Sequence, residues 1–149
     1  MRIIYWFIFV LIAFNFKVNA QCNNELIDLC LKDIGGATYL KEFPVKLKKG
    51  KKGKQPPFAR FAVALKKGTQ YRFNVKNDVA NQSFAILTLS DNYTVYGSTY
   101  QQDEEKDYST FDFYCKKTGT YYISFLFKDY KEGCAVGMLS MVDVFKIYH

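Results

Sequence analysis

The sequence has almost no histidine and, beyond its first twenty residues, no tryptophan. The only histidine among the 149 residues is His149, the last one, and the only tryptophan is Trp6. Serine and cysteine nucleophiles depend on a neighbouring base, which is usually a histidine, so we expect no such chemistry here. We therefore predict no catalytic residues and a protein that is not an enzyme. A pair of carboxylates, for example Asp112 and Asp129, remains open as the basis of a small hydrolase.

The sequence also lacks C-x-x-C pairs, although it contains four cysteines. Structural zinc sites usually combine closely spaced cysteines and histidines, so we expect no metal and no cofactor. An even number of cysteines in an exported chain favours disulfides instead, here two. The candidates are Cys22, Cys30, Cys115 and Cys134.

Cysteines that are neighbours in the sequence cannot pair in the simplest layout of the chain. Cys22 and Cys30 on one helix would lie about 12 Å apart. Cys115 and Cys134 would lie at opposite ends of one strand, about 25 Å apart, whereas a disulfide requires Cα atoms within ~7 Å. Either crossed bridges join the helix to the strands, or the strand order in this region is different.

Only one long hydrophobic run is present, IIYWFIFVLIAF at residues 3–14. It follows a charged start and precedes small residues at 18 and 20, which is typical of a secretory signal cleaved after Ala20. The run is shorter than the ~20 residues of a membrane span. We expect a secreted or periplasmic protein with no membrane span after cleavage. A lipid anchor on Cys22 is an open alternative.

Basic residues are concentrated in one half of the chain. Twelve Lys or Arg and one acid lie within residues 41–76, whereas residues 78–143 hold ten acids and five lysines. A run rich in Lys, Gly and Pro at 46–57 predicts an exposed loop. Its six lysines could bind a polyanion such as lipopolysaccharide, an acidic polysaccharide or nucleic acid without sequence specificity, or they could simply solvate the loop and block edge pairing. These are Lys46, Lys48, Lys49, Lys51, Lys52 and Lys54.

One fifteen-residue pattern occurs twice, as FAVALKKGTQYRFNV at 61–75 and FDFYCKKTGTYYISF at 111–125. Each copy has large apolar residues at alternate positions on both sides of a five-residue connection, as expected for two strands with one buried face. We expect each copy to be a strand-turn-strand unit, with Gly68 and Gly119 supplying a positive φ in the connection. Two such units facing each other would share one core.

The order of elements predicts the fold class. A short helix is expected between Asn23 and Ile34, because apolar residues recur there at helical spacing and Gly35 follows. Seven to nine short strands follow, the first at 39–47, where Pro44 indicates a sheet edge. We therefore predict an all-β protein, an antiparallel, jelly-roll-like β-sandwich with a short N-terminal helix. The predicted organisation is a signal at 1–20, a helical segment at 21–37 and a single sandwich domain at 38–149.

Part of the chain resembles a known family. The segments AILTLSDNYTVYGSTY and GTYYISF, within residues 58–127, resemble the bacterial pre-peptidase C-terminal domain and related jelly-roll modules. Leu87, Leu89 and Asp91 match the middle motif, and Gly119 opens the closing one. The chain is also similar to small stand-alone secreted proteins of Bacteroidetes-type bacteria. The resemblance implies a sandwich fold and an accessory role, with no catalytic residues.

Two further groups of side chains are candidate sites. Four tyrosines could form a platform for sugar rings, although Tyr93 and Tyr100 lie on opposite strand faces; the four are Tyr93, Tyr96, Tyr100 and Tyr108. Tryptophan, the usual sugar platform, is absent after residue 20, which favours packing of these tyrosines in the core and on the sheet surface instead. The acidic stretch QQDEEKD at 101–107 could donate oxygens to calcium, but it lacks the regular spacing and the glycine of a calcium loop.

The hypothesis with most support is an exported, non-catalytic binding module at the bacterial envelope, with a protein or a polyanionic glycan as ligand. The alternative is a structural or assembly component of an envelope complex.

Overall fold

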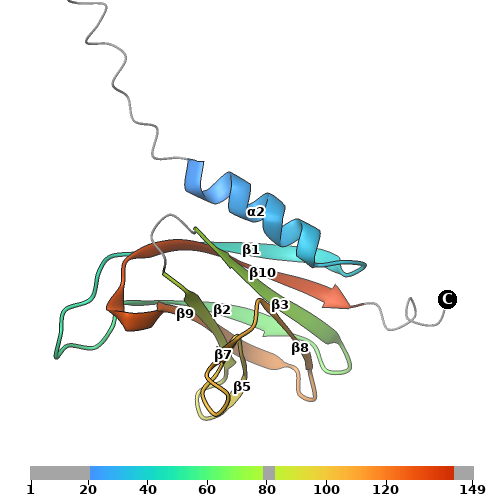
Figure 1. The fold of residues 1–149 in the computed structure, drawn as a ribbon. Helices are drawn as coiled ribbons and strands as arrows, with labels where there is room; N and C mark the ends of the chain where they lie inside the picture. Colours follow the sequence, from blue (N-terminus) through green and yellow to red (C-terminus); the bar gives the residue numbers. More distant parts are fainter. Residues whose placement is uncertain (1–20, 79–82, 143–149) are drawn as a thin grey trace, which may run out of the picture.

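The structure is a computed structural model that describes residues 21–78 and 83–142, with the backbone alone for residues 21–23. The expected signal at 1–20 lies outside the described residues. The elements, drawn in Figure 1, are α2 (Gln21–Asp33), β1 (Thr38–Leu47), β2 (Phe58–Leu65), β3 (Gln70–Asn77), β4 (Ala85–Ser90), β5 (Val95–Ser98), β6 (Tyr100–Gln101), β7 (Lys106–Asp107), β8 (Thr110–Tyr114), β9 (Gly119–Phe127), the 3₁₀ turn η2 (Lys128–Tyr130) and β10 (Gly133–Val142).

Eight strands form two antiparallel four-stranded sheets. Sheet A has the order β1-β10-β3-β8 and sheet B the order β2-β9-β4-β5, while β6 and β7 form a separate ribbon. The chain passes from one sheet to the other at every connection within these eight strands except β4 to β5, which is the arrangement of a jelly roll. The predicted jelly-roll-like sandwich with a short N-terminal helix is therefore confirmed. Pro44 lies in β1, at an edge of sheet A as predicted.

The two copies of the repeated pattern do not form the two separate units that the sequence suggested. β2 and β3, the first copy, lie in different sheets, and so do β8 and β9, the second copy. Instead β2 pairs with β9 and β3 pairs with β8, so each strand of one copy pairs with a strand of the other. Period-two alternation fixes which face of a strand is buried, but it does not fix which sheet the next strand joins.

Residues that lie opposite each other in one of these pairs have their counterparts, fifty residues away, opposite each other in the second pair. Phe61 lies opposite Ile123, and their counterparts Phe111 and Phe73 also lie opposite each other. The two copies are therefore related by an approximate two-fold axis that runs through the sandwich. The repetition in sequence corresponds to a symmetric pairing in space.

The two repeated connections, residues 66–69 and 116–119, lie against each other at one end of the sandwich. The N–H of Gly68 donates to the carbonyl of Cys115 at 2.8 Å, and the N–H of Cys115 donates to the carbonyl of Thr69 at 2.9 Å. These bonds extend the pairing of β3 with β8 into the connections, so the two turns are fixed relative to each other.

Only one of the two glycines adopts the backbone conformation that we expected. Gly68 has φ +83°, in the left-handed region that favours glycine. Gly119 is not among the residues with positive φ, because it already begins β9 in an extended conformation. The predicted role of Gly119 is therefore wrong.

The inward faces of both sheets form one core that is rich in aromatic rings. Phe61 packs between Phe43 and Phe125, with ring centroids 5.2 and 5.9 Å away, and Phe73 stacks on Phe111 at 5.2 Å. These contacts join strands of both sheets and both copies of the pattern, so the pooled apolar faces that the sequence predicted are present.

Gly137, in β10, makes room for the ring of Phe125. A Cβ at this position would collide with the ring of Phe125 and approach Leu87 Cδ1 to 3.2 Å. The absence of a side chain at residue 137 therefore lets the two sheets approach each other.

Helix α2 covers the outer face of sheet A, where it packs on β10 (Figure 1). Leu26, Cys30 and Ile34 of the helical segment form a second apolar cluster with Val136 and Met138. Strand β10 is consequently buried from residue 133 to residue 140, on one side by the core and on the other by the helix.

Polar contacts fix the helix on the sheet. Asn74, fully buried in β3, donates from Nδ2 to the carbonyl of Cys30 at 3.1 Å. Lys76 forms an ion pair with Asp33 at 2.6 Å. Because these partners are spaced along one side of α2, they set its position along the strands as well as its distance from them.

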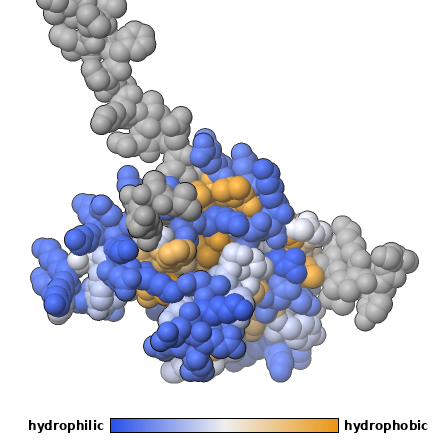
Figure 2. All heavy atoms as spheres, viewed as in Figure 1, coloured by the Kyte–Doolittle hydropathy of each residue, from blue (hydrophilic) through white to orange (hydrophobic). Residues whose placement is uncertain are grey.

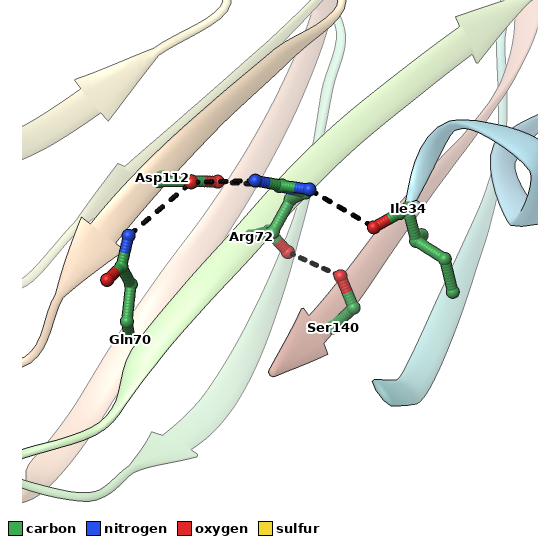
Figure 3. A network of polar contacts seen from close by, with 5 residues as sticks. All are labelled: Ile34, Gln70, Arg72, Asp112 and Ser140. Atoms are coloured by element: carbon green, nitrogen blue, oxygen red, sulfur yellow. Dashed lines mark hydrogen bonds and ion pairs between the residues drawn. The ribbon is translucent and has the colours of Figure 1, made fainter. Parts of the chain in front are cut away.

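Arg72 connects three parts of the fold, as Figure 3 shows. Its guanidinium donates to both carboxylate oxygens of Asp112 at 2.8 and 2.9 Å and to the carbonyl of Ile34 at 3.1 Å. Gln70 adds a weaker contact to Asp112 at 3.4 Å, and the Ser140 hydroxyl donates to the Arg72 carbonyl at 3.4 Å. One side chain thereby links β3 to β8 and to the end of the helix.

Gly137→Ala should lower the free energy of unfolding by about 1–3 kcal/mol, because its methyl group would enter space that the Phe125 ring occupies. Gly36→Ala is the matched control, since nothing lies within 4 Å of a Cβ built there, and it should change stability by less than about 0.5 kcal/mol. Urea unfolding of both variants is the measurement. Equal midpoints for the two variants would contradict this packing.

Candidate functional site

The six predicted lysines lie together at one end of the sandwich, on the connection from β1 to β2. Lys46 is in β1 and the other five are in the connection, which we call the lysine loop (48–57); all six are exposed. This loop projects at the left of Figure 1, and the same region is hydrophilic in Figure 2. None of the six forms an ion pair with a described carboxylate.

The base of the lysine loop is held by the rest of the protein. The N–H of Gly50 donates to the carbonyl of Tyr130 at 2.8 Å. A Cβ on Gly50 would come within 2.9 Å of both Pro57 and Tyr130, so only glycine fits there without a shift. The lysines are therefore carried by a loop with an anchored base.

A second group of exposed lysines lies at the opposite end of β2, on the two repeated connections. We call these connections the lysine turns; their lysines are Lys66, Lys67, Lys116 and Lys117. The N–H of Lys67 donates to Thr118 Oγ1 at 2.8 Å, a further bond between the two turns. Sequence reasoning did not single out these residues, because it treated the turns as two separate hairpins.

A hollow of about 220 Å³ adjoins the lysine turns. We call it the tyrosine pocket. Its lining residues come from the β4–β5 turn, from β5, from the second lysine turn and from the start of β9: Asp91, Asn92, Tyr93, Tyr96, Lys117, Thr118, Gly119, Thr120 and Tyr121.

Asp91 organises the turn that forms one wall of the pocket. Its Oδ1 accepts the N–H groups of Tyr93 and Thr94, both at 2.7 Å, and its Oδ2 accepts the hydroxyl of Tyr96 at 2.6 Å. The Tyr96 hydroxyl and these N–H groups hold the pKa of Asp91 below its usual value. The same bond raises the pKa of Tyr96, so at neutral pH the carboxyl group is charged and the phenol is neutral.

The floor of the pocket is an aromatic cluster. The ring of Tyr96 lies 5.3 Å from Phe113 and 5.4 Å from Tyr121. The Tyr121 hydroxyl donates to the carbonyl of Lys117 at 2.7 Å, and burial raises the pKa of Tyr121 to about 12. Both tyrosines are thus held by a hydrogen bond at one end and by ring contacts at the other.

The four tyrosines named from the sequence do not share one surface. Tyr93 and Tyr96 lie in the pocket, whereas Tyr100 and Tyr108 lie at the β6–β7 ribbon. The ammonium group of Lys128 lies 3.9 Å from the centroid of the Tyr100 ring, and the Tyr108 hydroxyl donates to Glu104 at 3.1 Å. Of the four candidate tyrosines, only Tyr93 and Tyr96 therefore lie together at one site.

The acidic stretch at 101–107 forms the connection of the β6–β7 ribbon. Asp107 pairs with Lys128 at 2.6 Å. Within residues 21–78 and 83–142, no three His, Cys, Asp or Glu side chains are grouped as metal ligands. The carboxylate candidate Asp112 is bound on both oxygens by Arg72.

The prediction of two disulfides is wrong. Cys30 and Cys115 are free thiols with no exposed surface. Each fills an apolar position: Cys30 packs on β10, and Cys115 occupies the place that Leu65 holds in the first copy of the pattern. Cys134 is disulfide-bonded, while the side chain of Cys22 lies outside the described residues.

No family model and no curated protein matches the chain. The resemblance to the pre-peptidase C-terminal domain therefore stays a prediction. No helix in the described part of the chain is long and apolar enough to cross a membrane.

Asp91 is the main pocket residue whose role the sequence did not reveal. It had been noted only as part of a motif, although S-D-N before a tyrosine is typical of a turn in which Asp accepts backbone N–H groups. The contribution of Lys117 to the same hollow had no such local signal, because it depends on how β9 pairs.

Cys30 and Cys115 should resist iodoacetamide in the native protein and react in urea. The thiolate is the reactive form, and burial raises the pKa of Cys30 to about 11. Peptide mapping after labelling at pH 8, without a reductant, is the measurement. Rapid native labelling of either residue, or failure of either to react after unfolding, would contradict its assignment as a buried free thiol.

Proposed function

We propose that the protein is an exported, non-catalytic binding module of the bacterial envelope with an anionic ligand, either a protein or a polyanionic glycan. The observation that carries the proposal is the lysine loop. Six exposed lysines without an ion-pair partner in the described chain project from an anchored base. Such a cluster attracts anions at long range and is sensitive to salt.

The anchoring of the loop distinguishes this proposal from a loop that only confers solubility. A solubilising loop requires exposure alone, whereas the backbone bond from Gly50 to Tyr130 fixes where the lysines leave the sandwich. A loop whose base is already ordered loses less conformational entropy when it binds. The expected export, which places the protein at the envelope, depends on the signal pattern at residues 1–20.

The absence of catalysis is part of the same proposal. Asp112, one of the two carboxylates considered for a hydrolase, is engaged by Arg72 on both oxygens. The free thiols Cys30 and Cys115 are buried and have no access to a substrate. These observations support a binding role over a chemical one.

An assembly role is the second candidate, and strand β1 favours it. β1 is a ten-residue strand at the edge of sheet A, and Tyr39 and Leu40 near its start are exposed. An exposed edge strand can pair with another chain. Association that rises with protein concentration in the absence of any ligand would favour this alternative.

Replacing Lys49, Lys51, Lys52 and Lys54 with Ser should weaken binding to heparin about tenfold or more at ~0.05 M salt. The reason is that several contacts between lysines and the sulfate groups of heparin would be lost. The matched control replaces four exposed lysines spread over other elements and so removes the same charge: Lys32, Lys41, Lys106 and Lys131. Elution from a heparin column and titration at several salt concentrations are the measurements.

The control should elute much closer to the unchanged protein than the loop variant does. Equal losses in the two variants would show that net charge alone causes retention, and the lysine loop would then not be the binding surface.

A further inference from the structure

The tyrosine pocket presents one aromatic ring that the fold itself does not use. The side chain of Tyr93 is 95% exposed, although it is carried by a turn with fixed geometry. The Asp91 carboxylate binds the N–H of Tyr93, so the backbone below the ring is held in place. An exposed ring on a backbone of fixed geometry is the kind of surface on which an amphipathic ligand can pack.

Polar groups surround this ring. Thr118 Oγ1 accepts the N–H of Lys67, so its hydroxyl hydrogen is available for another acceptor. Asn92 and Thr120 also line the hollow. The combination of two tyrosine rings with amide and hydroxyl groups is suited to a ligand that has both C–H faces and many hydroxyls, and a sugar ring has both.

The charged residues in and beside the pocket favour an acidic sugar over a neutral one. Asp91 is the one acid that lines the hollow, and three hydrogen bonds from the protein already engage it. Lys117 lines the hollow, and the other three lysines lie on the adjoining lysine turns. None of these four lysines pairs with a carboxylate in the described chain. Within the hollow the charges of Asp91 and Lys117 offset each other, so the surplus positive charge lies beside it, on Lys66, Lys67 and Lys116 of the adjoining turns.

The volume of the pocket sets the size of the ligand. Pockets for drug-sized molecules are roughly 300–1,000 Å³, and this hollow measures about 220 Å³. A single sugar ring matches it better than a folded peptide segment, and its open side lets a longer chain continue over the lysine turns.

We propose that the tyrosine pocket binds one unit of an acidic saccharide, a sugar bearing a carboxylate or a sulfate, with its ring against Tyr93 and Tyr96 and its acidic group at Lys117. This site is at the opposite end of β2 from the lysine loop. The proposal deepens the proposed function by naming a ligand class, but it depends on different residues and can fail or hold separately.

The test is calorimetric titration of the mature protein with a galacturonate tetrasaccharide, a sulfated heparin tetrasaccharide and a neutral galactose tetrasaccharide. At least one acidic probe should bind saturably, and at least tenfold more tightly than the neutral one. Tyr93→Ser and Lys117→Ser should each weaken that binding tenfold or more. Tyr39→Ser and Lys131→Ser, also at exposed positions but outside the pocket, should leave it unchanged.

Three results would overturn the proposal: no saturable binding of either acidic probe, equal binding of the neutral probe, or unchanged binding by Tyr93→Ser and Lys117→Ser. Because Tyr93 is almost fully exposed, its replacement should leave the melting temperature unchanged, so lost binding cannot be attributed to unfolding. The four-lysine loop variant separates the two proposals, since it should keep tetrasaccharide binding even if its retention on heparin falls.

Discussion

The pairing of the two copies of the repeated pattern, β2 with β9 and β3 with β8, is the constraint on which the rest of the structure depends. It places strands of each copy in both sheets, so the apolar faces meet in one core. It also brings the two lysine turns together through the bonds between Gly68, Thr69 and Cys115. The tyrosine pocket depends on a further pairing, that of β9 with β4, which brings Tyr121 of β9 and Lys117 of the preceding turn to the turn that Asp91 organises.

The helix determines which surfaces remain open. α2 covers the outer face of sheet A and is fixed there by Asn74, by Arg72 and by the apolar cluster around Cys30. The lysine loop and the lysine turns then occupy opposite ends of the sandwich. Both ends are basic, but they differ in form, because the lysine turns adjoin a hollow lined by Tyr93 and Tyr96, whereas the lysine loop projects from the sandwich. For this reason we assign them different ligand properties, a diffuse attraction at one end and a defined saccharide unit at the other.

The sequence predicted the sandwich because period-two burial is a local property: Phe61, Val63 and Leu65 alternate with small exposed alanines whatever strand lies beside them. The partner of each strand is not local, so the symmetric exchange between the copies was missed, and with it the extended backbone at Gly119. Counting cysteines predicted two disulfides, but a buried cysteine can also serve as a small apolar residue, as Cys115 does in the place of Leu65. The lysine loop was predictable because a run of charges excludes burial; the pocket was not, since its residues meet only through the pairing of β9.

The central claim is the exchange of strands between the two copies, and nuclear Overhauser contacts in the labelled protein test it most directly. The account predicts backbone contacts between Phe61 and Ile123 and between Phe73 and Phe111, together with slow amide exchange at Gly68 and Cys115. Two independent hairpins would instead give backbone contacts between β2 and β3 and between β8 and β9. Observation of that second set, in place of the first, would contradict the account.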